Sequence, residues 1–152
     1  MKKTALLVID VQKGFDDPSL GKRNNPAAES NIARLLAAWR EQKRPLIHIR
    51  HNSTEPNSPF RPELPGNAFK DEVRPLPGEK QFTKTVNSAF IGTGLVEYLG
   101  EQGIASLVIV GLTTDHCVST SVRMAANLGF GMLNRRTLER KRFGYDNIKM
   151  EV

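Results

Sequence analysis

Three residues that could together perform nucleophilic chemistry lie far apart in the chain: Asp10, Lys84 and Cys117. A thiol becomes a nucleophile when a base takes its proton or a nearby positive charge stabilises the thiolate. Asp10 is a candidate for that base, and Lys84 could orient the carboxylate and hold negative charge. Cys117 is the only cysteine, so the sequence excludes an intramolecular disulfide and a cysteine metal cluster.

Each of the three residues also has a plainer interpretation. A lone cysteine is usually a small buried hydrophobic side chain, Lys84 could be a surface lysine, and Asp10 could cap a helix or ligate a metal. Their common position favours a site, because each follows a predicted strand and ligands bind at the carboxyl ends of strands in open α/β sheets. Cys117 is also expected to begin a helix, whose dipole and free N–H groups favour a thiolate and could form an oxyanion hole.

Strands and helices are predicted to alternate along the chain. Apolar runs favour buried strands, and a spacing of three and four residues between Ile32, Leu35, Leu36 and Trp39 favours a helix, capped by Asn25 with Pro26 in its first turn. The expected strands cover residues 4–9, 46–49, 80–84 and 106–110, and the further expected helices cover residues 93–102 and 117–129. This order predicts a Rossmann-like, three-layer α/β/α fold with a mainly parallel sheet.

Length and composition are those of one ordinary globular domain. The chain has 152 residues, with 25% charged and 39% hydrophobic residues. The apolar run at the N-terminus is about five residues, shorter than the core of a signal peptide, and nothing approaches the ~18 apolar residues of a membrane span. We therefore expect a cytoplasmic protein without a membrane partner.

The net charge of +6 raises the question of nucleic acid as a partner. Half of this charge lies in the last 18 residues, which favours a solvated basic end over a binding site, so no nucleic-acid partner is expected. We divide the chain into a domain over residues 1–134 and an atypical basic tail over residues 135–152.

The residues around the three candidates resemble motifs of the isochorismatase-like, nicotinamidase-related cysteine hydrolases. The three similar stretches are ALLVIDVQKGF (5–15), FTKTVNSAF (82–90) and VGLTTDHCVSTSVRMAA (110–126). They occur in the order found in that family, and the resemblance covers residues 4 to 130.

The resemblance implies a role for each matching residue. Asp10 would be the general base, Lys84 its charged partner and Cys117 the nucleophile. A cis peptide would precede Thr113, and the N–H groups of Thr113 and Cys117 would form the oxyanion hole. Phe15 would line the substrate pocket. The implied activity is cleavage of a C–N amide-type bond of a small molecule through a thioester, without a cofactor, in an enzyme that forms homo-oligomers.

The histidines do not follow the metal-binding pattern of nicotinamidases, which use an Asp-x-His pair and a further histidine. Residue 49, two before His51, is isoleucine, and His48 and His51 are three apart, which on a strand directs them to opposite faces. We expect them to be structural or adjacent to the substrate, and we expect no metal. Adjacent residues rarely face each other, so we do not expect His116 to act directly on its neighbour Cys117. Residues 52–78 form a long, irregular, proline-rich stretch, and its part from Ser53 to Pro65 is expected to cover the site.

The sequence departs from the family after residue 130. No strand-like run follows Leu133, so the last strand and helix are predicted to be altered or missing, as in a truncation or a shifted reading frame. Two alternatives therefore stay open beside the amidase. One is an isochorismatase-type vinyl-ether hydrolase, which uses the aspartate as an acid and needs no cysteine. The other is a non-catalytic, truncated member of the family.

Overall fold

The structure is a computed structural model, which describes residues 3–132 and 150–151. It is built on a sheet in which every pairing is parallel, in the order β3-β2-β1-β4-β5, with β6 also paired to β4. The strands are β1 (Lys3–Ile9), β2 (Leu46–His51), β3 (Lys80–Lys84), β4 (Ile104–Gly111), β5 (Gly131–Met132) and β6 (Met150–Glu151).

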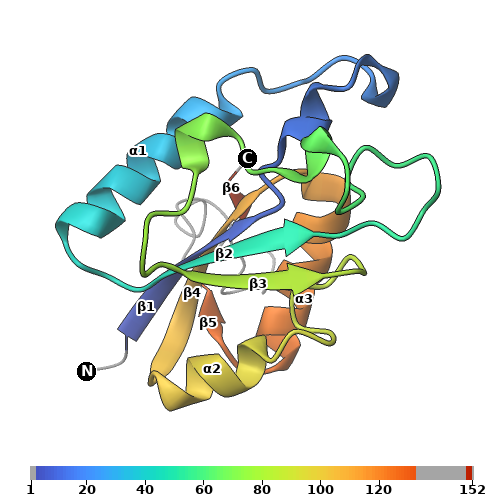
Figure 1. The fold of residues 1–152 in the computed structure, drawn as a ribbon. Coiled ribbons are helices and arrows are strands. Elements are labelled where there is room, and N and C mark those ends of the chain that lie inside the picture. The colour runs from blue at the N-terminus through green and yellow to red at the C-terminus, as the bar shows by residue number, and fades with distance from the viewer. Residues whose placement is uncertain (1–2, 133–149, 152) are drawn as a thin grey trace, which may run out of the picture.

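Helices cover both faces of the sheet, as Figure 1 shows, and the predicted three-layer α/β fold is confirmed. The helices are α1 (Ala28–Glu41), α2 (Leu95–Glu101) and α3 (Ser119–Asn127). Alternate residues of β1 point to opposite layers: Leu6 and Val8 pack with α1, whereas Leu7 and Ile9 pack with α2 and α3. This double burial explains why β1 is an uninterrupted apolar run.

The first helix begins later than the sequence predicts. Asn25 and Pro26 lie before α1, whose first residue is Ala28. The Asn25 side chain accepts a hydrogen bond from the Ala27 N–H at 3.2 Å, which closes a turn ahead of the helix instead of capping it. The expected face is nevertheless correct, since Ile32, Leu36 and Trp39 are buried.

The edge of the sheet beside β4 is where the last strand was predicted to be altered or missing. Two short strands, β5 and β6, pair there in succession with the start and the end of β4. Most of the predicted basic tail, and any helix in it, lies outside the described residues. Among the helices that the structure describes, none is long and apolar enough to cross a membrane.

The strand order places a topological switch point between β1 and β4. The chain runs from β1 outward through β2 and β3, then returns to the other side of β1 as β4. Gly111 ends β4 against Ile9, where φ is +151° and an added Cβ would lie 2.1 Å from the Ile9 carbonyl oxygen. Only glycine allows this approach. The carboxyl ends of β1 and β4 therefore meet closely at the place where ligands bind in such sheets.

A group of charges centred on the buried Glu29 and Lys70 ties the loop before α1 to the body of the protein. Glu29 on α1 accepts hydrogen bonds from Arg23 and, at 2.7 Å, from the Lys70 ammonium, which also contacts Asp16. Burial alone would raise the pKa of Glu29, but hydrogen bonds from Arg23 and Lys70 outweigh it and lower this pKa from 4.5 to about 2. The ionised carboxylate is therefore part of the folded structure.

Replacing Glu29 by glutamine is expected to lower the free energy of unfolding at pH 7 by about 2–3 kcal/mol, because two cations lose their partner. Because the pKa of Glu29 is lower in the folded than in the unfolded protein, its carboxylate stabilises the fold fully above the unfolded pKa near 4.5. This stabilisation is lost as the pH falls through about 2. Urea unfolding should therefore show a smaller difference in stability between the wild type and Glu29→Gln at pH 3 than at pH 7. Glu41→Gln, at an exposed position of the same helix, is the control, and an equal loss at both pH values would contradict this assignment.

Candidate active site

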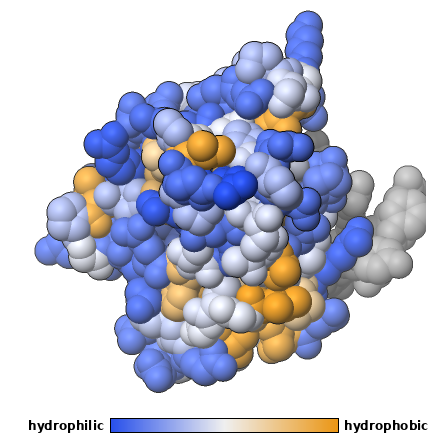
Figure 2. All heavy atoms as spheres, turned by 45° about the vertical axis from the view of Figure 1, so that its right-hand side comes forward, coloured by the Kyte–Doolittle hydropathy of each residue, from blue (hydrophilic) through white to orange (hydrophobic). Residues whose placement is uncertain are grey.

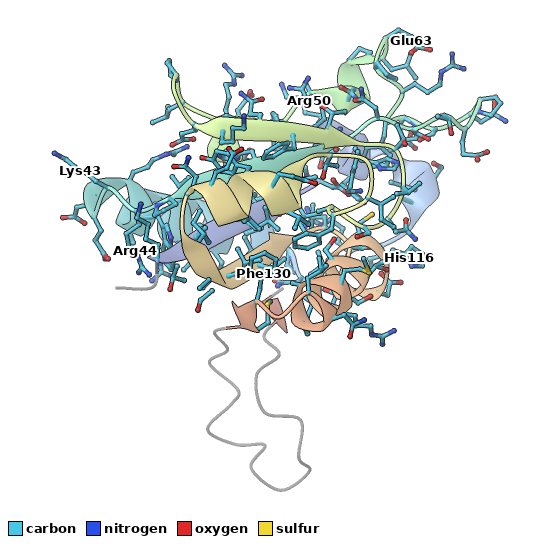
Figure 3. All side chains as sticks on the ribbon, turned by 90° about the horizontal axis from the view of Figure 1, so that it is seen from below. Lys43, Arg44, Arg50, Glu63, His116 and Phe130 are labelled. Carbon is cyan, nitrogen blue, oxygen red and sulfur yellow. The ribbon has the colours of Figure 1, made fainter. Side chains whose placement is uncertain are left out.

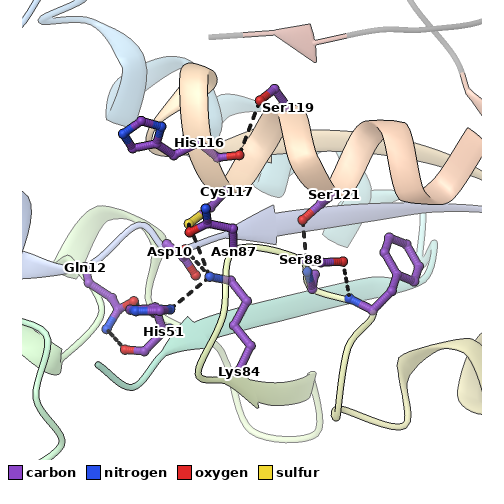
Figure 4. A network of polar contacts seen from close by, with 12 residues as sticks. Asp10, Gln12, His51, Lys84, Asn87, Ser88, His116, Cys117, Ser119 and Ser121 are labelled. Atoms are coloured by element: carbon purple, nitrogen blue, oxygen red, sulfur yellow. Dashed lines mark hydrogen bonds and ion pairs between the residues drawn. The ribbon is translucent and has the colours of Figure 1, made fainter. Parts of the chain in front are cut away.

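The Lys84 ammonium is the centre of the site, and it contacts all the predicted partners (Figure 4). Its Nζ lies 2.7 Å from Asp10 Oδ2 and 3.3 Å from Cys117 Sγ. It also lies 3.0 Å from His51 Nδ1. The sequence therefore predicted correctly that Asp10, Lys84 and Cys117 converge at one edge of the sheet. Lys84 is 1% exposed, so it is not the surface lysine that its residue type would suggest.

Asp10 is held at the ends of two neighbouring strands, β1 and β2. It follows β1 directly and has a left-handed φ of 54°, which is uncommon for a residue with a side chain. Its N–H donates to the Ile49 carbonyl at 3.0 Å, and its own carbonyl accepts from the Gln12 N–H at 2.8 Å. Burial raises the pKa of the carboxyl above its usual 3.8, although Lys84 acts in the opposite direction. Asp10 is thus a carboxylate with more affinity for a proton than usual.

Cys117 lies in a single π-helical turn, Thr114–Val118, which leads into α3. Its Sγ is 3.7 Å from Asn87 Oδ1, besides its contact with Lys84. Burial raises the pKa of the thiol to about 12, and the Asp10 carboxylate adds to this effect while Lys84 counteracts it. The prediction that a helix start favours a thiolate is therefore wrong for the free protein. Desolvation and Asp10 keep the proton on sulfur.

A cavity of about 700 Å³ opens beside these groups. Cys117 and Asp10 lie in its wall, as do Thr113 and Phe15, which the sequence placed in the oxyanion hole and the substrate pocket. The peptide bond between Leu112 and Thr113 is cis, as the resemblance implied. Residues 20–25 form another part of the wall, and Phe60 is the member of the proline-rich stretch that reaches it.

The three histidines have different environments. His48 is fully buried and its Nε2 lies 2.8 Å from Glu79 Oε2, which is a structural contact beneath α1. His51 lines the cavity. Figure 3 shows His116 at the end of the molecule away from Lys43 and Arg44, with its side chain directed outward. Within residues 3–132 and 150–151, no group of three histidine, cysteine, aspartate or glutamate side chains is arranged to hold a metal ion.

Sequence reasoning missed several residues that shape the site. Asn87 approaches the thiol, and Arg23 reaches the cavity wall while bound to Glu29. Gln12 fixes the backbone of His51 through two hydrogen bonds. The only signal for Asn87 and Gln12 was their closeness in sequence to Lys84 and Asp10. Arg23 had no signal, because its position depends on how the loop folds back.

The face of the protein drawn in Figure 2 is mainly polar. Figure 2 shows hydrophilic side chains over most of one face, with a smaller group of hydrophobic residues in its lower part. The large hydrophobic side chains with the highest exposure include Ile91, Leu20 and Leu76. Of these, Leu20 lies in the cavity wall, so its exposure places an apolar side chain at the opening of the site.

The fold and the site define a three-layer α/β protein that carries a thiol, a carboxylate and an ammonium at the carboxyl end of a parallel sheet. The profile of the Isochorismatase domain matches residues 4–133. The chain belongs to the isochorismatase family of hydrolases, as its three motifs predicted.

Two relatives and one solved structure illustrate the likeness. The isochorismatase family protein YrdC of Bacillus subtilis is 52% identical over 129 residues, which is 85% of this chain and 69% of YrdC. The maleamate amidohydrolase of Pseudomonas putida is 30% identical over 145 residues, covering 85% of this chain and 68% of that enzyme. A crystal structure of an isochorismatase family hydrolase from Chromobacterium violaceum is 56% identical, with a TM-score of 0.82 over 85% of this chain and 67% of that one.

Proposed function

We propose that the protein is a cysteine hydrolase that cleaves a C–N amide-type bond of a small molecule through a thioester. The observation that carries the proposal is the contact of one buried ammonium, Lys84, with both the Asp10 carboxylate and the Cys117 thiol beside a cavity. The similarity to a maleamate amidohydrolase supports an amide as the substrate. A cavity of about 700 Å³ suits a small molecule.

In the first half of the proposed reaction, Asp10 takes the proton of Cys117 as Sγ attacks the substrate carbonyl carbon. The raised pKa of Asp10 suits it to this task, and the high pKa of the thiol makes a neighbouring base necessary. The Asp10 proton then passes to the departing nitrogen, the C–N bond breaks, and an acyl thioester remains on Sγ. Lys84, 2.7 Å from Asp10 Oδ2, holds the carboxylate in place.

In the second half, Asp10 removes a proton from water, and the resulting hydroxide attacks the thioester carbonyl. The C–S bond breaks, the acid product leaves, and the proton returns to sulfur. We assign the Thr113 and Cys117 N–H groups as donors to the oxyanion in both halves, since both residues lie in the cavity wall. Phe15, whose ring lies tilted against that of Phe60 with centroids 4.6 Å apart, is assigned to the apolar side of the substrate.

The pH dependence of thiol alkylation tests the proposed acid–base pair. Between the raised pKa of Asp10 and the value of about 12 for Cys117, the pair holds one proton that can pass between them. Alkylation by iodoacetamide is therefore expected to keep a component that does not change with pH across this window. In Asp10→Asn that component should disappear, leaving a rate that rises about tenfold per pH unit as the thiol ionises.

Turnover is tested by ammonia release from a panel of small primary amides that includes maleamate, with a vinyl-ether substrate as a further member. Ammonia release from an amide supports the proposal. Cleavage of the vinyl ether alone, unchanged in Cys117→Ala, would favour an isochorismatase-type reaction with Asp10 as the acid. Identical alkylation profiles for the wild type and Asp10→Asn, with no turnover of any compound, would favour a non-catalytic family member.

A further inference from the structure

His51 is fixed from its backbone outward, although the proposed reaction gives it no role. The Gln12 side chain bonds both backbone groups of His51: its Oε1 accepts from the His51 N–H at 2.8 Å, and its Nε2 donates to the His51 carbonyl at 3.0 Å. Asn67 donates to the same carbonyl at 3.1 Å. Phe60 packs edge-on against the ring, with centroids 6.4 Å apart. Such support is typical of a side chain whose position matters.

The contact with Lys84 determines which ring nitrogen of His51 carries the proton. An ammonium has three N–H groups and accepts nothing. The three atoms close to Lys84 Nζ are Asp10 Oδ2, Cys117 Sγ and His51 Nδ1. His51 Nδ1 must therefore accept, which requires a neutral ring with its hydrogen on Nε2. Burial, with the neighbouring Lys84 charge, lowers the pKa of His51 to about 4, so the ring stays neutral at physiological pH.

The other nitrogen of the ring remains available to a ligand. His51 lines the cavity that Cys117 and Asp10 also line. The hydrogen bonds that His51 forms within residues 3–132 and 150–151 use Nδ1 and its backbone groups, and none of them uses Nε2. A fixed N–H group in a pocket wall, a short way from the nucleophile, is suited to an acceptor atom of a bound molecule.

We infer that His51 is both a positioning residue and a substrate-binding residue. Through Nδ1 it accepts a hydrogen bond from Lys84, whose ammonium also bonds Cys117 Sγ and forms an ion pair with Asp10, and so keeps the ammonium between these two residues. Through Nε2–H it donates to a carbonyl or carboxylate oxygen of the substrate. The second part rests on the proposed function and makes the substrate an amide that presents such an oxygen toward His51.

Nuclear magnetic resonance tests the tautomer directly. Long-range ¹H–¹⁵N spectra of protein labelled at histidine are recorded from pH 5 to 8, and the His51 signals are those absent in His51→Gln. We expect the Nε2–H tautomer throughout this range. A ring protonated on Nδ1, or one that titrates near the ordinary value of about 6.5, would overturn the inference, whether or not the protein hydrolyses amides.

Two amide substitutions separate the two contacts of the ring. Asparagine can place an oxygen near the position of Nδ1, whereas glutamine can place an N–H group near the position of Nε2. His51→Asn should alkylate with iodoacetamide at a rate within about twofold of the wild type, and His51→Gln about fivefold more slowly at pH 7, as expected for one lost hydrogen bond. The opposite order, or equal rates, would contradict the positioning role. Thermal unfolding of both variants shows that each is folded.

The substrate contact is tested with acetamide, a small amide that offers a single carbonyl oxygen. Adding acetamide should shift the His51 Nε2–H signal in the wild type, and the shift should saturate. For an amide that the wild type turns over, KM should rise about tenfold in His51→Asn and less in His51→Gln. An unmoved Nε2–H signal would refute the binding role. Failure of every amide to react, with the tautomer as expected, would instead refute the proposed function.

Discussion

Cys117→Ala is expected to lower the rate of amide hydrolysis by on the order of 10⁴- to 10⁶-fold, because it removes the atom that forms the acyl intermediate. The fold should be retained, since the side chain is small and only partly buried. The change is measured as kcat on the best amide of the panel, with thermal unfolding in parallel. Cys117→Ser keeps the shape of the side chain and is expected to be nearly as inactive, because an alcohol is harder to ionise than a thiol.

The intermediate itself can be observed. Rapid quenching of the wild type with an amide substrate should give a protein whose mass has increased by the acyl group, and the added mass should be absent in Cys117→Ala. Full activity in Cys117→Ala would exclude a thioester and leave a mechanism in which Asp10 acts directly on the substrate or on water. A loss of activity together with a loss of folding would not distinguish these cases, which is why Cys117→Ser is included.

Asp10→Asn is expected to have the second large effect, and it should appear in both activity and stability. Removing a general base typically lowers rates by about 10²- to 10⁴-fold. Here the same change also leaves the Lys84 ammonium buried without its carboxylate, 2.7 Å away in the wild type. Breaking such a buried pair costs about 3–5 kcal/mol of stability. Both quantities are measured on one preparation, by kcat and by urea unfolding.

The double substitution Asp10→Asn with Lys84→Met is the matched control for that prediction. It removes both charges and keeps a side chain of similar length at position 84, so the free energy of unfolding should recover by several kcal/mol relative to either single variant. Activity should remain lost. If the loss of stability in the double variant equals the sum of the losses in the two single variants, the two side chains do not interact in the folded protein.

The sequence predicted most of the fold because the central strands β1, β2 and β4 are apolar runs that lie largely buried within the sheet. An apolar run such as β1 has few other places to lie than inside a sheet. Asp10, Lys84 and Cys117 lie at or after the carboxyl ends of three different strands, so the parallel topology alone brings them together. The predicted start of α1 was a few residues too early, because the Asn25 side chain closes a turn instead of capping the helix. Local sequence allows both outcomes, and packing decides between them.

The electrostatics of the site could not be predicted in the same way. The helix start near Cys117 suggested a thiolate, but burial and the nearby Asp10 raise the pKa of the thiol to about 12. Burial at a given position depends on elements far away in the chain. The same is true of His51, whose contact with Lys84 joins the ends of β2 and β3. Its residue type alone was compatible with a structural role or with a place near the substrate.

The Arg23–Glu29 contact has a consequence for how this enzyme could change during evolution. Arg23 and its neighbours in residues 20–25 reach the cavity from a loop, whereas the chemical groups are carried by the ends of β1 and β3 and by the turn before α3. Mutations in the loop can therefore alter which molecules enter while the reacting groups keep their geometry. In laboratory selection for new substrates, the first beneficial substitutions should accordingly occur in residues 20–25, whereas Glu29, which anchors that loop, should be retained.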